Sequence, residues 1–258
     1  MEYLQSALSG IVEGITEFLP VSSTFHLIWT SRLLGIAQNE FQKAYEVIIQ
    51  AGAILAVVFL YWKILINDKK LILKILTSFL PTAMVGLVLY KVIKNIFFEN
   101  YLLQITVFLI VGIVFILYER YRKNKSLKKT LNDLSFKETL IIGLSQSLAV
   151  IPGVSRAGAV ILIMMMLGIK REEAAKFSFL LAVPTLFAAS VLDLVKLMPI
   201  LFTQTDKIGY LAVGFLAAFL SALIVVKWLI KFLQNHTLSS FGWYRILAGG
   251  ILLASLFA

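Results

Sequence analysis

The chain has no cysteine and little charge, and both shortages narrow its class. Asp, Glu, Lys and Arg make up 15% of its 258 residues, whereas a soluble domain usually carries about a quarter charged residues. The absence of cysteine excludes disulfide bonds, thiolate metal sites and a cysteine nucleophile. Only two histidines remain as candidates for imidazole chemistry.

Hydrophobic residues take the place of the missing charge. They account for 60% of the chain, and the mean hydropathy is +0.90. Near-continuous apolar runs, such as 44–62 and 210–226, approach the roughly 20 residues that cross a bilayer as a helix. Barrel strands would be shorter and would alternate in polarity. The composition therefore predicts an all-α integral membrane protein.

The net charge of +10 comes from Lys and Arg in the loops between apolar segments. That placement follows the positive-inside rule, so we expect a lipid bilayer and no nucleic acid as partner. Glu2 stands where a secretory signal would carry basic residues, and no small-residue cleavage site follows. The first helix is therefore expected to stay in the protein.

The apolar segments fall into two length classes. Six are long enough to span a membrane, at 44–66, 71–93, 102–120, 176–195, 208–230 and 241–258. Four are short and form two pairs around polar elbows with proline: 3–19 with 25–36 around LPVSST, and 138–151 with 157–169 around IPGVSR. Such interrupted segments are typical of re-entrant hairpins. We predict six transmembrane helices plus two re-entrant helical hairpins, at 3–36 and 138–169.

The two halves align without gaps at a shift of 133 residues. The shift pairs LGI at 34–36 with LGI at 167–169, and also pairs Gly10 with Gly143, Val21 with Val154, Ser22 with Ser155 and Glu40 with Glu173. Each half holds one hairpin and three spans, an odd number, so we predict an inverted-topology repeat. We predict one membrane domain, 1–258, divided into repeat 1 at about 1–121, a basic connector at 119–137 and repeat 2 at about 138–258.

Basic residues predict the orientation. Most lie on one side of this topology: Lys63, Lys69, Lys70, Lys74, the run ERYRKNKSLKK at 119–129, Lys170, Arg171, Lys176, Lys227 and Lys231. The positive-inside rule makes that side cytoplasmic. The first elbow then opens to the outer face, the second elbow opens to the cytoplasm, and both termini lie outside.

The stretch VEGITEFLPVSSTFHL, at 12–27, concentrates polar residues in an otherwise apolar chain. Glu13 and Glu17 are spaced i, i+4 and share one helix face. A charge at bilayer depth costs about 2.5–3.5 kcal/mol on insertion scales. A divalent cation, an arginine or raised pKa values would offset that cost. Alternatively, this helix end lies in the interface and the glutamates are solvated.

Pro20 ends the first short helix, and three hydroxyl residues follow it: Ser22, Ser23 and Thr24. They are candidate N-caps for a helix that carries His26 in its first turn. A helix N-terminus binds anions, phosphate especially. The alternatives are simple capping and a structural histidine. The other histidine, His236, is expected to be solvated in a loop.

The second elbow, IPGVSRAG, repeats this design with different chemistry. Gly153 allows close backbone approach, Ser155 caps the next helix, and Arg156 falls in its first turn. Arg156 is the one basic residue that this topology places at membrane depth, and its planar fork suits phosphate oxygens. Gln146 aligns with Glu13, so the acidic pair belongs to the first half only.

Together the elbows predict one site. Carboxylates there would hold a divalent metal, Arg156 would bind phosphate oxygens, and His26 and a serine would act as base and nucleophile. These are the parts that phosphoryl transfer needs. Alternatively, Arg156 forms a structural ion pair with Glu13 or Glu17. A site at membrane depth implies a phosphate carried on a lipid.

EGITEFLPVSSTFHL and PGVSRAG closely resemble the two signature motifs of the undecaprenyl-diphosphate phosphatase family, also called bacitracin-resistance proteins. FQKAYEVIIQAGAILAVV and KFSFLLAVPT look like that family too, so the resemblance covers essentially the whole chain. It implies a multi-pass enzyme of the bacterial inner membrane that removes the terminal phosphate of the C55 lipid undecaprenyl diphosphate. The product is the carrier recycled for cell-wall synthesis. The resemblance also implies a site facing the outer side and a need for Mg²⁺ or Ca²⁺.

The motif positions of this family give three groups of candidate site residues. They are catalytic Glu17, Ser23, His26 and Arg156; phosphate-binding Ser22, Thr24, Gly153, Ser155 and Arg156; and metal-ligating Glu13 and Glu17. The family's second motif usually has a serine where this chain has Ala157, which argues against an essential hydroxyl there.

The nucleophile stays open between Ser22, Ser23, His26 and a metal-bound water. We favour Ser23 with His26 as its base. Glu46 and Gln50 either form hydrogen bonds inside the bundle or line the wall of the site.

Transport is the competing function, because inverted repeats with opposed hairpins are a transporter architecture. A flippase or exchanger of lipid phosphates would use a similar acid, histidine and arginine set. A monomer and a homodimer both stay open.

Overall fold

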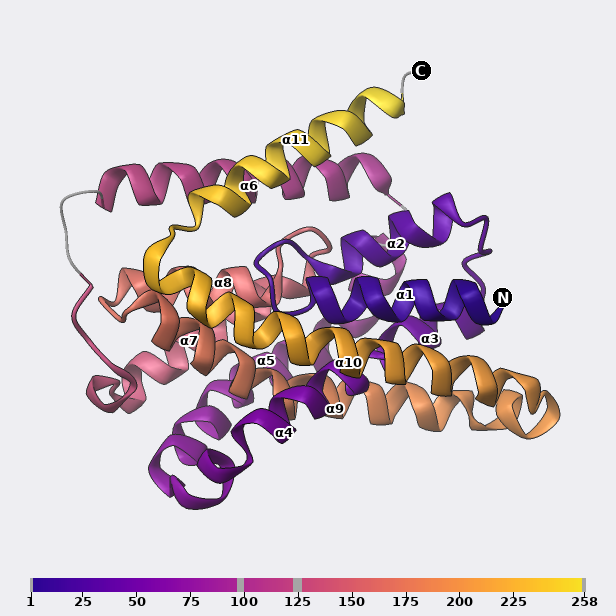
Figure 1. The fold of residues 1–258 in the computed structure, drawn as a ribbon, viewed down its shortest axis with the longest axis horizontal. Coiled ribbons are helices and arrows are strands. Elements are labelled where there is room, and N and C mark those ends of the chain that lie inside the picture. The colour runs from indigo at the N-terminus through magenta and orange to yellow at the C-terminus, as the bar shows by residue number, and fades with distance from the viewer. Residues whose placement is uncertain (1, 97–99, 123–126, 257–258) are drawn as a thin grey trace. The chain divides into compact units, whose positions relative to one another are not determined.

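The computed structural model describes residues 2–96, 100–122 and 127–256. Over these residues the chain is helical apart from turns, loops and one isolated bridge between Lys129 and Ile169. Figure 1 shows the helices, which run α1 Tyr3–Thr16, α2 Ser23–Leu33, α3 Glu40–Ile48, α4 Gln50–Asn67, α5 Lys69–Ile96, α6 Tyr101–Arg122, η1 Leu131–Asp133, α7 Phe136–Ser147, η2 Leu148–Val150, α8 Arg156–Met166, α9 Arg171–Thr203, α10 Asp206–Asn235 and α11 Ser239–Ser255.

The predicted all-α class is confirmed. Each predicted apolar segment contains a helix, but the four short segments 3–19, 25–36, 138–151 and 157–169 extend past the ends of their α-helices, and 257–258 lie outside the described residues. The segment predicted at 44–66 is interrupted at Ile49, where α3 ends and α4 begins.

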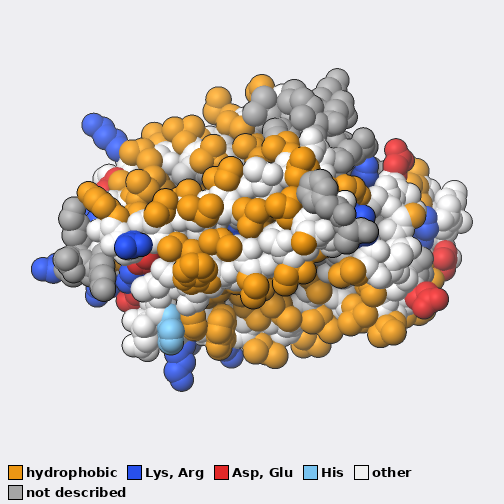
Figure 2. Space-filling view, turned by 90° about the horizontal axis from the view of Figure 1, so that it is seen from above, with side chains coloured by type: hydrophobic (Ala, Val, Ile, Leu, Met, Phe, Trp, Pro, Cys, Tyr) orange, Lys and Arg blue, Asp and Glu red, His pale blue; other side chains and the backbone are white. Residues whose placement is uncertain are grey.

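Five helical stretches of the described chain are long and apolar enough to cross a membrane: Glu40–Asn67, Lys69–Val88, Tyr101–Arg122, Arg171–Thr203 and Asp206–Asn235. The sixth predicted span falls on α11, which has 17 residues. Figure 2 shows a face covered largely by hydrophobic side chains, with charged side chains mostly toward its margins. A surface of this kind matches lipid, whereas the number of spans stays a prediction.

The chain forms two compact units. Unit 1 comprises Met1–Phe18, Ser23–Ile72 and Phe179–Trp228, and unit 2 comprises Leu19–Ser22, Leu73–Ser178 and Leu229–Ala258. Each unit combines segments from both predicted repeats. The repeat boundaries themselves stay a prediction.

In unit 1, glycines bring helices close together. A Cβ on Gly10 of α1 would collide with the backbone carbonyl of Gly214 in α10, and a Cβ on Gly52 of α4 would collide with that of Phe215.

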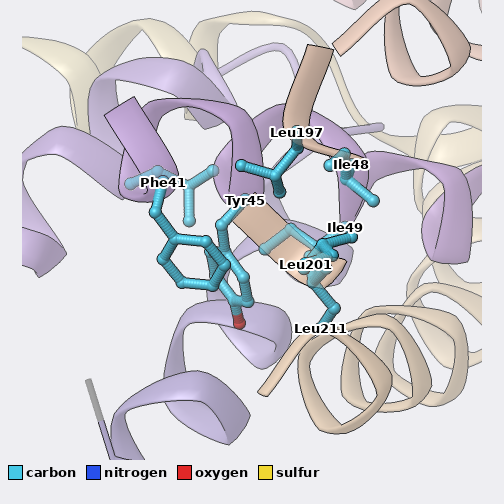
Figure 3. Close-up of a cluster of buried hydrophobic side chains, with 8 residues drawn as sticks. Phe41, Tyr45, Ile48, Ile49, Leu197, Leu201 and Leu211 are labelled. Carbon is cyan, nitrogen blue, oxygen red and sulfur yellow. The ribbon is translucent and has the colours of Figure 1, made fainter. Parts of the chain in front are cut away.

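A buried apolar cluster lies beside these contacts (Figure 3), formed by Leu27, Phe41, Tyr45, Ile48, Ile49, Leu197, Leu201 and Leu211. The Tyr45 hydroxyl lies 2.8 Å from Ser6 Oγ in α1, so its polar end is satisfied.

In unit 2, α6 and α11 cross closely because glycines face each other. A Cβ on Gly112 would lie 3.0 Å from the carbonyl oxygen of Gly242, and a Cβ on Gly242 would lie 2.7 Å from that of Gly112. Figure 1 shows the two helices side by side. Here the backbones pack directly, as small residues allow in membrane helices.

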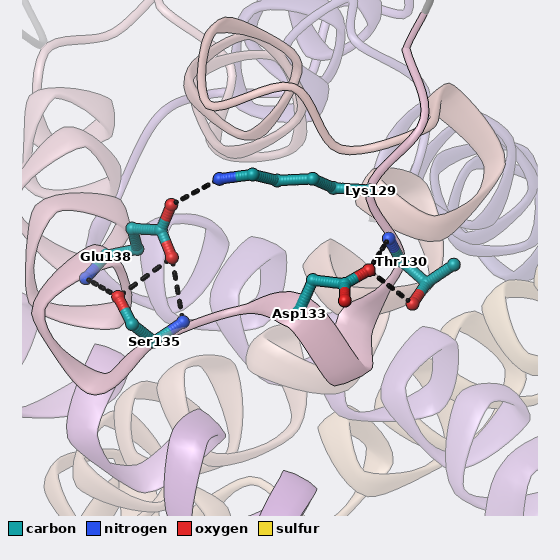
Figure 4. A network of polar contacts seen from close by, with 5 residues as sticks. All are labelled: Lys129, Thr130, Asp133, Ser135 and Glu138. Carbon is teal, nitrogen blue, oxygen red and sulfur yellow. Dashed lines mark hydrogen bonds and ion pairs between the residues drawn. The ribbon is translucent and has the colours of Figure 1, made fainter.

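The connector before α7 is held by two successive capping boxes (Figure 4). Asp133 accepts hydrogen bonds from the backbone and the hydroxyl of Thr130, at 2.8 and 2.9 Å. Glu138 accepts from the backbone N–H of Ser135 at 2.7 Å and pairs with Lys129 at 3.1 Å. These local bonds fix where α7 begins.

Candidate active site

The acidic pair lies at the C-terminal end of α1, in unit 1. Glu13 and Glu17 are 0% and 6% exposed, and Glu17 is the C-cap residue of the helix. The alternative of two solvated glutamates at the interface is therefore wrong for this structure. Two buried carboxylates one turn apart need compensation from a cation or from hydrogen-bond donors.

One such donor is Ser23, the first residue of α2. Its hydroxyl donates a hydrogen bond to a carboxylate oxygen of Glu17, and both side chains are buried. A hydroxyl held by a carboxylate in a buried place is the arrangement of a nucleophile and its base.

The two other polar residues of this helix start are Thr24 and His26, and both are half-buried. The His26 ring lies edge-on to Phe25, with 5.8 Å between ring centroids. As predicted, His26 belongs to the first turn of α2. It lies one turn beyond Ser23, so it shares that end of the helix.

The second elbow lies in unit 2 and begins α8. Ser155 caps this helix by accepting the backbone N–H of Gly158 at 3.1 Å, as the sequence predicts. Arg156 is the first helical residue, is 9% exposed, and donates to the carbonyl of Ser178 at 2.9 Å. Gly153 has φ +100, and a Cβ there would lie 2.8 Å from the Gln104 carbonyl oxygen, so only glycine fits without strain.

The elbow of the first hairpin, Leu19–Ser22, also belongs to unit 2. Ser22 has φ 67 and Ser155 has φ 68, the two positive values among non-glycine residues of the described chain. A left-handed backbone at a residue with a side chain is strained and is found most often at functional sites. Each serine directly precedes a helix, α2 or α8. The two elbows therefore share a positive φ at the residue that precedes the helix.

Sequence reasoning missed Arg245. It singled out Arg156 as the basic residue at membrane depth, but the structure also buries Arg245 completely, in α11. Arg245 donates to the carbonyl of Pro20 at 2.9 Å, to that of Phe108 at 3.1 Å, and to that of Gly153 in a shorter bond. A single arginine inside an apolar run was the signal that could have found it.

A second polar cluster extends from α2 to α3 in unit 1. A carboxylate oxygen of Glu46 accepts from Ser31 at 2.8 Å, from Gln38 at 2.9 Å and from Gln42 at 2.9 Å. Glu46 is therefore satisfied by hydrogen bonds inside the bundle, one of the two predicted alternatives. Gln50 is buried at the start of α4.

His236 is exposed and stacks on Phe232, in agreement with the prediction of a solvated histidine.

A divalent cation would have to be held by the carboxylates of α1. Among the described residues, no group of three or more His, Asp or Glu side chains gathers as a metal cage. The buried carboxylates of Glu13 and Glu17 nevertheless fit Mg²⁺, which is held by one or two carboxylates together with waters and substrate phosphates. Ca²⁺ prefers the same oxygen ligands but takes more of them.

These features define a class: an all-helical membrane protein in which each of two strained elbows starts a helix bearing polar or charged groups. The family described as "Bacitracin resistance protein BacA" matches residues 6–251, and the chain belongs to this family. Proteins named undecaprenyl-diphosphatase are similar over nearly the whole length. The relative from Sulfurihydrogenibium sp. (strain YO3AOP1) is 49% identical over 96% of this chain and 97% of its own. Those from Aquifex aeolicus and Campylobacter fetus subsp. fetus are each 45% identical over at least 95% of both chains.

Proposed function

We propose that this chain is an undecaprenyl-diphosphatase, a membrane enzyme that hydrolyses the terminal phosphate from undecaprenyl diphosphate. Undecaprenyl phosphate and inorganic phosphate are the products, and the lipid returns to cell-wall synthesis. This activity explains bacitracin resistance in the family. The proposal is supported by the names of relatives that match nearly the full chain, and by the site residues that the chain carries.

The observation that carries the proposal is the hydrogen bond from Ser23 to Glu17. We assign Ser23 as the nucleophile: its oxygen attacks the terminal phosphorus, its proton passes to Glu17, and the bond from that phosphorus to the bridging oxygen breaks, so that undecaprenyl phosphate leaves. Water then attacks the phosphoryl group held on Ser23, which releases inorganic phosphate and restores the hydroxyl. This replaces His26 as the first base, because Glu17 is the partner of the Ser23 hydroxyl. His26, one turn further along α2, is then the group that handles the proton of the hydrolytic water.

The phosphate groups need positive partners and hydrogen-bond donors. The backbone N–H groups at the starts of α2 and α8, and the guanidinium of Arg156, supply these. We propose that both elbows serve one diphosphate. Arg245 supports this, because it donates to the carbonyls of Pro20 in the first elbow and Gly153 in the second, all within unit 2. Ser22, Thr24, Gly153 and Ser155 then bind phosphate oxygens in this proposal.

We propose Glu13 and Glu17 as ligands of a divalent cation, Mg²⁺ or Ca²⁺. When bound, the cation would neutralise phosphate charge as it develops in the transition state. In this proposal Glu13 and Glu17 hold the ion, Glu17 also accepts the proton of Ser23, and Arg156 stabilises the transferred phosphoryl group. Two buried carboxylates on one helix face support this assignment.

We propose an inverted-topology repeat with six spans and two re-entrant hairpins in the bacterial inner membrane. Helix bounds support the repeat: α1 and α7 begin 133 residues apart, and so do α2 and α8. Charge placement supports an outward-facing site, since the basic connector and its neighbours belong on the cytoplasmic side.

The test is phosphate release by the purified protein in detergent micelles, with a C55 or shorter prenyl diphosphate and Mg²⁺ or Ca²⁺. Hydrolysis that disappears in Glu17→Ala and Arg156→Ala variants supports the enzyme. A flippase would instead move lipid phosphate across the membrane of sealed vesicles without hydrolysis, and that result would contradict the proposal.

A further inference from the structure

Arg245 is a large charged side chain with no place in the reaction as described. It lies in α11, is 0% exposed, and packs its guanidinium carbon 4.4 Å from the ring centroid of Phe108 and 5.6 Å from that of Phe115. A buried arginine without partners would be strongly destabilising. The acceptors of its hydrogen bonds therefore indicate which parts of the structure Arg245 stabilises.

Two of its three acceptors are elbow carbonyls. Arg245 donates through one terminal nitrogen to Pro20 at 2.9 Å and through the other to Gly153. Both residues lie outside the helices, where carbonyls lack the regular i+4 partner and must find another donor. A guanidinium has five N–H donors in a rigid fork, so it can bridge two separate turns where a lysine cannot.

The acceptors are equivalent positions of the two halves. Pro20 and Gly153 are related by the same 133-residue shift that relates Ser22 to Ser155. The counterpart of Arg245 under this shift is Gly112 in α6, and a Cβ on Gly112 would lie 2.9 Å from the Cβ of Arg245. Two arginines would collide there. One arginine facing one glycine leaves a single guanidinium to hold both elbows.

Direct substrate binding by Arg245 does not fit this geometry. Its side chain has no exposed surface, and each of its three nitrogens already donates to a backbone carbonyl. Each elbow carbonyl it holds lies two residues before a strained serine, Ser22 or Ser155. Arg245 thus acts on the site through the shape of the two turns.

We propose that Arg245 is a positioning residue that locks both elbows into their left-handed conformation, and so sets Ser22, Ser155 and Arg156 for phosphoryl transfer. This inference rests on the proposed phosphatase function for its kinetic consequence only. The structural consequence, two turns that loosen together when the guanidinium is lost, does not depend on any activity.

Lys74 is the matched control. It is also buried, with 2% of its surface exposed. Its ammonium group donates hydrogen bonds to two backbone carbonyls of unit 2, to that of Leu131 at 2.8 Å and to that of Asn132 at 3.3 Å. These carbonyls belong to the connector and not to an elbow. The comparison of Arg245→Met with Lys74→Met therefore separates elbow positioning from the general cost of losing a buried cation.

The structural arm uses a spin label. Because the chain has no cysteine, a single Val154→Cys substitution at a half-buried elbow position gives one labelling site. In full-length protein that elutes as a folded peak in detergent, Arg245→Met and Arg245→Lys should raise the mobility of this label, and Lys74→Met should not. Unchanged mobility in both Arg245 variants would overturn the proposal.

The kinetic arm uses phosphate release. Arg245→Lys should lower kcat by about 10- to 100-fold with KM within about threefold, because misplacing catalytic groups by an ångström costs about that much. In an Arg156→Lys background, the same change should have a much smaller effect, since both act on the second elbow. Equal kcat losses for Lys74→Met and Arg245→Lys would contradict a positioning role. If the parent protein releases no phosphate, the proposed function fails while the spin-label result still decides the structural claim.

Discussion

The two elbows share a positive φ at the residue before the helix and differ in chemistry. Ser22 and Ser155 have φ 67 and 68, and each is followed at once by the first residue of a helix. That first residue is Ser23 in one elbow and Arg156 in the other. The positive φ is thus common to both elbows, and the residue that follows it decides whether the helix start presents a hydroxyl or a cation.

The helices that lead into the elbows differ in the same way. Glu13 of α1 has Gln146 of α7 as its counterpart under the shift, and both side chains are buried. The amide of Gln146 donates to the hydroxyl of Thr82 at 2.9 Å. The neutral amide costs little to bury, whereas a carboxylate is kept at a cost that only a function such as cation or proton binding explains. Under the proposed function, Glu13 and Glu17 of α1 would supply the acid–base chemistry, and Arg156 of α8 would supply the fixed positive charge.

The largest expected loss of activity comes from replacing the carboxylate of Glu17 with a neutral amide. Glu17→Gln keeps the shape but removes the acceptor for the Ser23 proton, so we expect kcat for phosphate release to fall by about a thousandfold. Glu138→Gln, which alters a connector carboxylate, should stay within about twofold. A Glu17→Gln enzyme that keeps a third of its activity would rule out Glu17 as the base.

Replacing Arg156 tests the positive charge of the second elbow, and a smaller loss of activity is expected. Arg156→Lys keeps the charge but loses the planar fork, so we expect kcat/KM to fall by about 100-fold. Arg171→Lys is the control, because Arg171 pairs with Glu119 at the start of α9 and lies outside both elbows. Equal activity of the two lysine variants would show that the fork geometry at 156 is irrelevant.

Hydropathy and proline placement predicted the helices well, because apolar length and helix breakers are local properties. The break at Ile49 was not predicted, since no proline or glycine marks it. Ser155 as a cap and Arg156 as the first helical residue were predicted from their spacing after the proline–glycine pair.

Contacts between distant segments escaped prediction. The bond from Ser23 to Glu17 depends on how α1 and α2 pack, and the Arg245 contacts join α11 to turns at Pro20 and Gly153. Neither spacing nor composition encodes such partners. The sequence suggested His26 as the partner of the Ser23 hydroxyl, because imidazole is a common base. In the structure the partner of that hydroxyl is the carboxylate of Glu17.

The shared positive φ can be tested at the two serines themselves. Glycine adopts positive φ freely, whereas alanine keeps the strain and lacks the hydroxyl. Ser155→Gly should therefore be more stable than Ser155→Ala by about 1–2 kcal/mol, and Ser22→Gly should exceed Ser22→Ala by a similar amount. Thermal unfolding in detergent measures both differences. A preference for alanine at either position would mean that the two elbows do not share this backbone in the protein.

The smallest effect is expected in the connector that joins the two halves. The backbone N–H of Ser135 holds the pKa of the Glu138 carboxyl below its ordinary value, with further help from the Ser135 hydroxyl and Lys129. A depressed pKa means that this carboxylate stabilises the fold above its unfolded pKa of about 4.3, and that the contribution is lost as the pH falls through the lower folded value. Glu138→Gln should therefore lower the unfolding midpoint by about 1–2 °C at pH 7 and by less near pH 3. A midpoint difference that grows as the pH falls would give the opposite sign and would contradict the capping role of Glu138, whereas the elbow variants should keep their ranking at both pH values.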